Sequence, residues 1–150
     1  MNRLYNRILP FRYGYKHFRS DVDRFYSEYR NYRITSINNQ ILDFHRLDDF
    51  RISRFIRDPR DLVVSGYFYH HRGAEKWCRM VSPEERDWQM VNGNIPEKMD
   101  KNHSFFGYLQ SLNQEDGLIA EIEFRKYHFE SMLKWPVDDS RIKTIRYEDL

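Results

Sequence analysis

The chain contains 150 residues, enough for one domain with one hydrophobic core and too few for two comfortable domains. Hydrophobic residues make up 40%, charged residues 32%, and the formal net charge is +2, a composition typical of a water-soluble protein. No run approaches the roughly 20 apolar residues of a membrane helix, and the charged N-terminus lacks the apolar stretch of a signal peptide. We therefore expect a cytoplasmic protein without a membrane partner, and the single cysteine, Cys78, excludes an internal disulfide.

The N-terminal segment, residues 1–32, is basic and rich in tyrosine. Residues 1–33 carry eight Arg or Lys side chains against three acidic ones. Such a segment can bind nucleic acid through phosphate contacts and stacking, but an exposed amphipathic helix with a basic face explains it as well. Apolar residues spaced three or four apart predict a helix over residues 18–30. The charge alone does not lead us to expect nucleic acid as a partner.

Three short segments rich in β-branched residues predict strands, over residues 33–37, 51–56 and 141–147. The second predicted strand stops at Asp58-Pro59, where Asp is a good helix N-cap and Pro suits the first helical position. The spacing of apolar residues behind it predicts a helix to about residue 72.

The other predicted elements are helices and loops. Residues 40–50 are predicted to be a loop or a single helical turn, and a short helix is expected after Ser82-Pro83-Glu84-Glu85, within a mixed segment over residues 73–103. A long helix is predicted over residues 115–134, ending at Trp135-Pro136, with a core stripe made of Leu118, Ile119, Ile122, Phe129, Met132 and Leu133. Strands separated by helices favour an α/β fold: a small parallel sheet of about three strands flanked by helices.

An anion site is predicted where the second strand meets its helix. Arg57 lies at the carboxyl end of the strand, where open α/β sheets bind ligands, and its guanidinium matches phosphate oxygens. Ser65 lies seven residues after the N-cap Asp58, about two helical turns on, and therefore on the same face. The alternatives are an ion pair of Arg57 with Asp58 or Asp61, and Ser65 as a small residue in a close helix contact.

No metal site is expected. No two histidines have the i, i+4 spacing that zinc enzymes place on one helix face. The six histidines are His17, His45, His70, His71, His103 and His128.

The stretch FIRDPRDLVVSGYFYH, residues 55–70, resembles the 3′-phosphate motif of sulfotransferases that use 3′-phosphoadenosine 5′-phosphosulfate. That motif is a strand ending in Arg, then a turn, then a helix with Ser eight residues after the Arg. The resemblance implies that Arg57 and Ser65 hold the 3′-phosphate of this sulfuryl donor. The closing Tyr147-Glu148-Asp149-Leu150 is similar to the strand end that follows in the family, as are Glu115-Asp116-Gly117-Leu118 and Trp135, so the resemblance covers residues 33–150.

Two parts of the family pattern are missing. No glycine begins a Gly-x-x-x-x-Gly-Lys loop, which would cradle the 5′-phosphosulfate, and the nearest approach, Gly14-Tyr15-Lys16, follows no predicted strand. The family's catalytic His is absent from the matching strand, whose end is Thr35-Ser36-Ile37. His45 is the nearest candidate for the general base, with a carboxylate of Asp43, Asp48 or Asp49 as the alternative.

The resemblance implies a single, partial sulfotransferase domain over residues 1–150, with a P-loop-like three-layer fold. Its function would be transfer of a sulfuryl group to a hydroxyl or amine, without a metal. Because the phosphate loop is missing, an inactive fragment of such an enzyme is an equally open expectation. The alternative is a non-catalytic nucleotide- or nucleic-acid-binding module of the same fold. Residues 73–105 are expected to form the loops that bind the acceptor substrate. The sequence identifies neither the acceptor nor the oligomeric state. Four aromatic side chains there either line a pocket or pack in the core: Trp77, Trp88, Phe105 and Tyr108.

Overall fold

A computed structural model describes residues 14–38 and 40–150. The chain divides into two compact units, Met1–Phe50 and Arg51–Leu150. Among the described residues no helix has the length and apolar character needed to cross a membrane. The charged residues of the N-terminal segment up to residue 13, and any helix there, lie outside the described part.

The first unit is built on two short parallel strands, with Tyr15 opposite Ile34 and His17 opposite Ser36. The predicted helix over 18–30 begins only at Val22, because the Asp21 side chain caps it by accepting a hydrogen bond from the Arg24 N–H, 3.0 Å. The core of this unit consists of Phe18, Phe25, Leu42 and Leu47. The elements are β1 (Tyr15–His17), α2 (Val22–Glu28), η1 (Tyr29–Asn31), β2 (Ile34–Ser36) and η2 (Phe44–Arg46).

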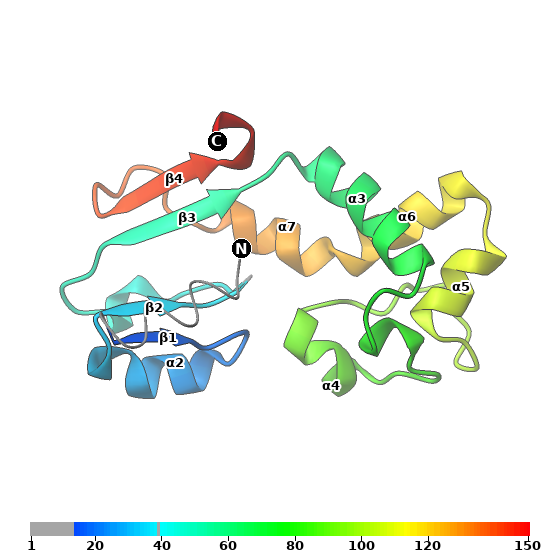
Figure 1. The fold of residues 1–150 in the computed structure, drawn as a ribbon, viewed down its shortest axis with the longest axis horizontal. Coiled ribbons are helices and arrows are strands. Elements are labelled where there is room, and N and C mark those ends of the chain that lie inside the picture. The colour runs from blue at the N-terminus through cyan, green and yellow to red at the C-terminus, as the bar shows by residue number, and fades with distance from the viewer. Residues whose placement is uncertain (1–13, 39) are drawn as a thin grey trace. The chain divides into compact units, whose positions relative to one another are not determined.

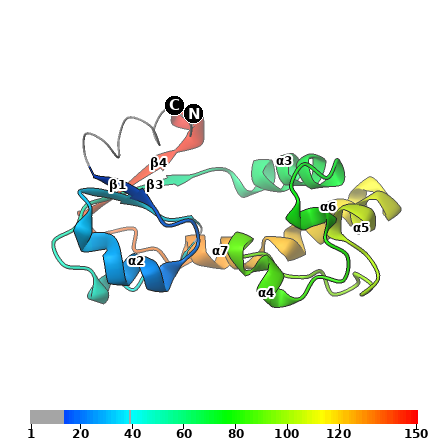
Figure 2. The ribbon, with the colours of Figure 1, turned by 60° about the horizontal axis from the view of Figure 1, so that its bottom comes forward.

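The second unit joins one pair of parallel strands to a group of helices, as Figures 1 and 2 show. Strand β3 leads directly into α3, which packs against α5 and α6. The elements are β3 (Ile52–Ile56), α3 (Pro59–His71), η3 (Trp77–Arg79), α4 (Glu85–Trp88), η4 (Gln89–Val91), α5 (Phe105–Ser111), α6 (Gln114–Phe124), α7 (Lys126–Leu133), β4 (Ile142–Arg146) and η5 (Tyr147–Asp149).

The α/β class and the parallel pairing are confirmed, and the three predicted strands correspond to β2, β3 and β4. Within the described residues the strands form two sheets of two strands each, β1–β2 and β3–β4, where a single sheet of about three had been predicted. The additional strand, β1, is three residues long and contains Lys16 and His17, so it lacks the β-branched run that identifies a strand.

The helix predicted over 115–134 is divided into α6 and α7 at Arg125, whose backbone angles of φ −88° and ψ 3° leave the helical region. The predicted core stripe is only partly observed: Leu118 packs against the core cluster, whereas Ile119, Ile122 and Leu133 are 49%, 48% and 85% exposed. The face that α6 buries consists of Gly117, Ala120, Glu121 and Phe124.

Aromatic side chains form the core of the second unit. Trp77 and Phe124 stack with ring centroids 5.1 Å apart, and Trp88 meets both rings edge-on. Trp88 and Phe105 are completely buried. Of the two roles considered for these aromatics, core packing is the one observed for Trp88 and Phe105.

A buried carboxylate determines which face of α6 packs against α3. Glu121 is 0% exposed, its Oε2 lies 2.8 Å from His70 Nδ1, and its Oε1 accepts a hydrogen bond from Arg125 Nε at 2.6 Å. A Cβ added at Gly66 of α3 would come within 2.1 Å of Glu121 Oε1. Helix α3 therefore approaches this network at Gly66, its one position without a side chain. Removing either partner of such a buried ion pair lowers the stability of the fold considerably.

We predict that Gly66→Ala destabilises the protein by about 2 kcal/mol or more, because the new methyl group displaces the Glu121 carboxylate from its partners. Gly107→Ala in α5 is the matched control, since its Cβ would meet only Ser104 Oγ at 3.3 Å. That change should stay within about 1 kcal/mol of wild type. Urea unfolding checks both, and equal midpoints for the two variants would contradict the role of the network.

Candidate anion-binding site

The parallel register of β3 and β4 sets the place of the candidate site. Ile56 lies opposite Arg146, so both strands end at the same edge. The chain leaves β3 through Arg57, and it leaves β4 through Tyr147 and Glu148. Segments 90 residues apart thereby meet at the start of α3.

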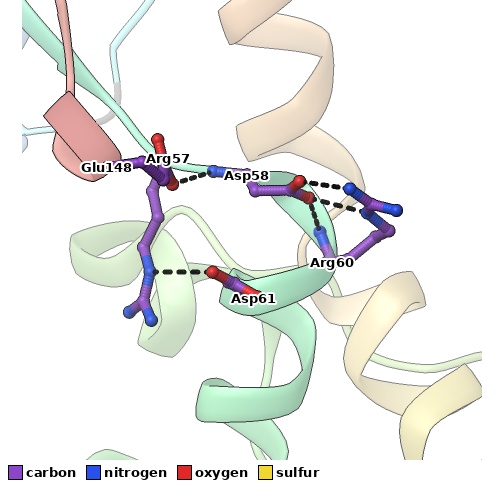
Figure 3. A network of polar contacts seen from close by, with 5 residues as sticks. All are labelled: Arg57, Asp58, Arg60, Asp61 and Glu148. Carbon is purple, nitrogen blue, oxygen red and sulfur yellow. Dashed lines mark hydrogen bonds and ion pairs between the residues drawn. The ribbon is translucent and has the colours of Figure 1, made fainter.

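The start of α3 is fixed by its own sequence, as predicted. Asp58 caps the helix by accepting from the Arg60 N–H at 2.9 Å, and Pro59 follows at the first helical position. The Asp58 carboxylate also accepts from Arg60 Nε and from a terminal nitrogen of Arg60, at 3.0 and 2.6 Å. These side-chain hydrogen bonds, followed by the backbone bond, lower the pKa of Asp58 to about 2. Arg60 is thus turned back onto the cap (Figure 3).

Arg57 is held differently. Its Nε is shielded from solvent, lies 4.0 Å from Asp61 Oδ2, and has no hydrogen-bond partner among the described residues. The guanidinium carbon lies 5.3 Å from the ring centroid of Tyr147, a cation–π contact. Figure 3 shows the side chain extending along α3 on the side of Asp61. Of the expected alternatives, the ion pair with Asp61 is present but is too long for a hydrogen bond.

Glu148 links the two segments directly. Its Oε1 accepts a hydrogen bond from the Asp58 backbone N–H at 2.8 Å, as drawn in Figure 3. That bond is the largest cause lowering the pKa of Glu148, and the charge of Arg57 adds to it. Sequence reasoning used residues 147–150 only as a family likeness. The contacts of Tyr147 and Glu148 were missed, although the parallel strands predicted around them would have indicated that both segments end at one edge.

Ser65 is exposed on α3, and its hydroxyl forms no hydrogen bond within the part of the chain that the structure describes. It lies one turn beyond Asp61, at i+4, and so on the face along which the Arg57 side chain extends. The close helix contact that was the alternative for Ser65 is made instead by its neighbour Gly66.

The remaining candidates lie in the first unit. His45 is exposed in η2, where its backbone N–H donates to Asp43 Oδ1 at 3.0 Å. Its role as general base stays a prediction. Asp48 pairs with Arg30. Of Gly14-Tyr15-Lys16, Tyr15 and Lys16 belong to β1, where no strand was predicted, and Gly14 precedes the strand with φ +60°.

Sequence reasoning also missed a polar cluster at the carboxyl ends of β1 and β2. Ser36 Oγ lies 2.7 Å from both His17 Nδ1 and the Tyr15 hydroxyl. His17 and Ser36 are opposite each other in the register, which was the signal available once β1 was recognised.

Within residues 14–38 and 40–150, no group of three or more His, Cys, Asp or Glu side chains is arranged to hold a metal ion. A scan against family models, a search of curated proteins and a search of solved structures found no match to this chain.

We predict that Arg60→Ala raises the pKa of Asp58 from about 2 toward the ordinary value of 3.8. Because the folded-state pKa is depressed, the stabilisation from this pair is complete above about pH 4 and disappears as the pH falls through about 2. Carboxyl NMR titration measures the pKa. Arg86→Ala, which removes an exposed partner of Glu84, is the control that should leave Asp58 unchanged.

Proposed function

We propose that the second unit binds the 3′-phosphate of 3′-phosphoadenosine 5′-phosphosulfate through Arg57 and Ser65, and that the protein is a sulfotransferase by descent. The observation that supports this most directly is the shielded Nε of Arg57, a donor without a hydrogen-bond partner among the described residues. A phosphate oxygen beside it would complete its hydrogen bonding and meet the charge of the guanidinium.

The contacts around the helix start favour a phosphate beside α3 over one at its end. The Asp58 N–H is taken by Glu148, and the Arg60 N–H is taken by the Asp58 carboxylate. Arg60 itself is neutralised by the same carboxylate. Arg57 and the exposed hydroxyl of Ser65 supply the remaining donors, and Asp61, 4.0 Å from Arg57, is the carboxylate that a phosphate would displace.

In the proposed reaction, an acceptor oxygen or nitrogen attacks the sulfur of the donor in line. The bond from sulfur to the bridging phosphate oxygen breaks, adenosine 3′,5′-diphosphate leaves with that electron pair, and a base takes the acceptor's proton. Arg57 and Ser65 contribute by holding the nucleotide in place, which lowers the entropic part of the barrier. A non-catalytic nucleotide-binding module would use the same two side chains, and the P-loop-like three-layer fold belongs to this proposal.

We predict that Arg57→Ala weakens binding of adenosine 3′,5′-diphosphate about ten- to a hundredfold, the effect of about 1.5–3 kcal/mol for a charged phosphate contact. Adenosine 5′-monophosphate, which has no 3′-phosphate, should bind equally to wild type and variant. Arg60→Ala is the matched control, because that guanidinium is already paired with Asp58. Isothermal titration calorimetry at fixed ionic strength measures all of these affinities.

Ser65→Ala should cost less, about two- to tenfold, because it removes a neutral hydroxyl donor. Wild-type binding is expected to be weak, with little or no sulfuryl transfer by these 150 residues alone. The proposal fails if Arg57→Ala and Arg60→Ala weaken binding equally, or if neither compound binds wild type. Measurable transfer would favour the enzyme over the binding module.

A further inference from the structure

His128 of α7 is buried with a hydrogen bond to only one of its two ring nitrogens. The residue is 7% exposed, and its Nε2 lies 2.8 Å from the backbone carbonyl oxygen of Val91 in η4. Because a carbonyl oxygen can only accept, Nε2 carries the hydrogen of the neutral ring, and Nδ1 is an acceptor. Nδ1 is shielded from solvent and has no hydrogen-bond partner among the described residues.

The hydrogen bond of His128 attaches the segment formed by residues 91–94 to the helices. The same segment also contacts Phe124, the last residue of α6. The Asn94 N–H donates to the Phe124 carbonyl oxygen at 3.0 Å. Gly93 lies against the Phe124 ring, because a Cβ added there would come within 2.0 Å of Cε2. These hydrogen bonds and this ring contact hold the segment against the junction of α6 and α7.

A second buried polar atom lies at the same aromatic ring. Trp88, three residues before Val91, is completely buried, and its Nε1 has no hydrogen-bond partner among the described residues. The rings of Trp88 and His128 both meet the Phe124 ring edge-on, with centroids 5.6 and 5.8 Å away. Burial of a polar atom without a partner is unfavourable. Exposure of this contact would let water bond to both atoms, which offsets part of the packing that is lost.

Protonation of His128 places a hydrogen on Nδ1, where no described group accepts it. Burial is the largest cause that lowers the pKa of His128 from its ordinary value of 6.5, and Arg125 and His70 lower it further. The hydrogen bond to Val91 and the charge of Glu121 raise it without reversing the direction. Because the folded-state pKa is lowered, the neutral ring stabilises the fold fully above about pH 6.5, and this stabilisation is lost as the pH falls.

We propose that residues 91–94 form a pH-sensitive flap, which His128 holds closed while its ring is neutral and releases when the ring is protonated. In the closed form the flap bonds to His128 and to the Phe124 carbonyl oxygen. In the open form the Nδ1–H of the imidazolium donates to water, and the Phe124 ring loses the cover of Gly93. The proposal does not depend on Arg57 or on the proposed sulfuryl donor.

The experiment measures amide hydrogen exchange of the whole chain by NMR at pH 7 and pH 5. Protection factors remove the intrinsic pH dependence of exchange. The Asn94 amide reports on the flap, and the amide of the completely buried Leu109 in α5 reports on unfolding of the unit. A histidine with the ordinary pKa in the open form favours opening up to about 25-fold more at pH 5 than at pH 7. We expect protection to fall about 5- to 25-fold at Asn94 and less than about twofold at Leu109.

His128→Gln is the test variant, because the glutamine amide can still donate to the Val91 carbonyl oxygen but does not titrate. Its Asn94 protection should change less than about twofold between pH 7 and pH 5. His103→Gln is the matched control, since it removes an exposed histidine, and it should keep the wild-type response. His70 is present in both variants, so a response that comes from His70 would appear in both.

NMR of the His128 ring in wild type gives a check that needs no variant. At pH 6, where an exposed histidine is mostly protonated, the ring should be neutral with its hydrogen on Nε2. The proposal is overturned if this ring titrates with the ordinary pKa, or if Asn94 loses no protection at pH 5. It is also overturned if Asn94 and Leu109 lose protection equally, or if His128→Gln keeps the wild-type response.

Discussion

The parallel ladder between β3 and β4 is the constraint on which the candidate site depends. It places the residues after both strands at one edge, so that Glu148 bonds to the Asp58 backbone and the Tyr147 ring lies against Arg57. Without that pairing the turn into α3 would keep its cap but lose both partners from the C-terminal segment. The two arginines of this turn differ in their hydrogen bonding. Arg60 donates to the carboxylate of the N-cap Asp58, whereas the shielded Nε of Arg57 has no hydrogen-bond partner among the described residues.

The buried Glu121 has a comparable effect on the helices. Because its carboxylate lies beneath Gly66, α3 can rest on α6 only with that face inward. The inward face then includes Val63, Tyr67 and His70, and Ser65 is left on the outside. A polar network within an aromatic core thus determines which side of α3 is available to a ligand, although it lies away from the site itself.

Sequence reasoning succeeded where local chemistry decides the outcome. Asp58-Pro59 specified a helix start, and β-branched runs specified β3 and β4. It failed where a tertiary contact overrides the local pattern: Ile119 and Ile122 have the spacing of a core stripe, but the pairing of Glu121 with His70 of α3 turns the Glu121 face of α6 inward. A charged residue is rarely expected in a core. The contacts at Arg57 were predictable only in outline, because the cross-strand register that brings Glu148 to Asp58 is not encoded in either segment alone.

One feature of the small sheets bears on how the protein behaves in concentrated solution. Among the described strands β3 pairs only with β4, so each has a row of backbone amides and carbonyls on its outer side without a strand partner. Phe55, 66% exposed, stands opposite Ile145 on that sheet. Open edges next to exposed apolar side chains are templates for strand addition between molecules. Charged substitutions along those edges would oppose such strand addition.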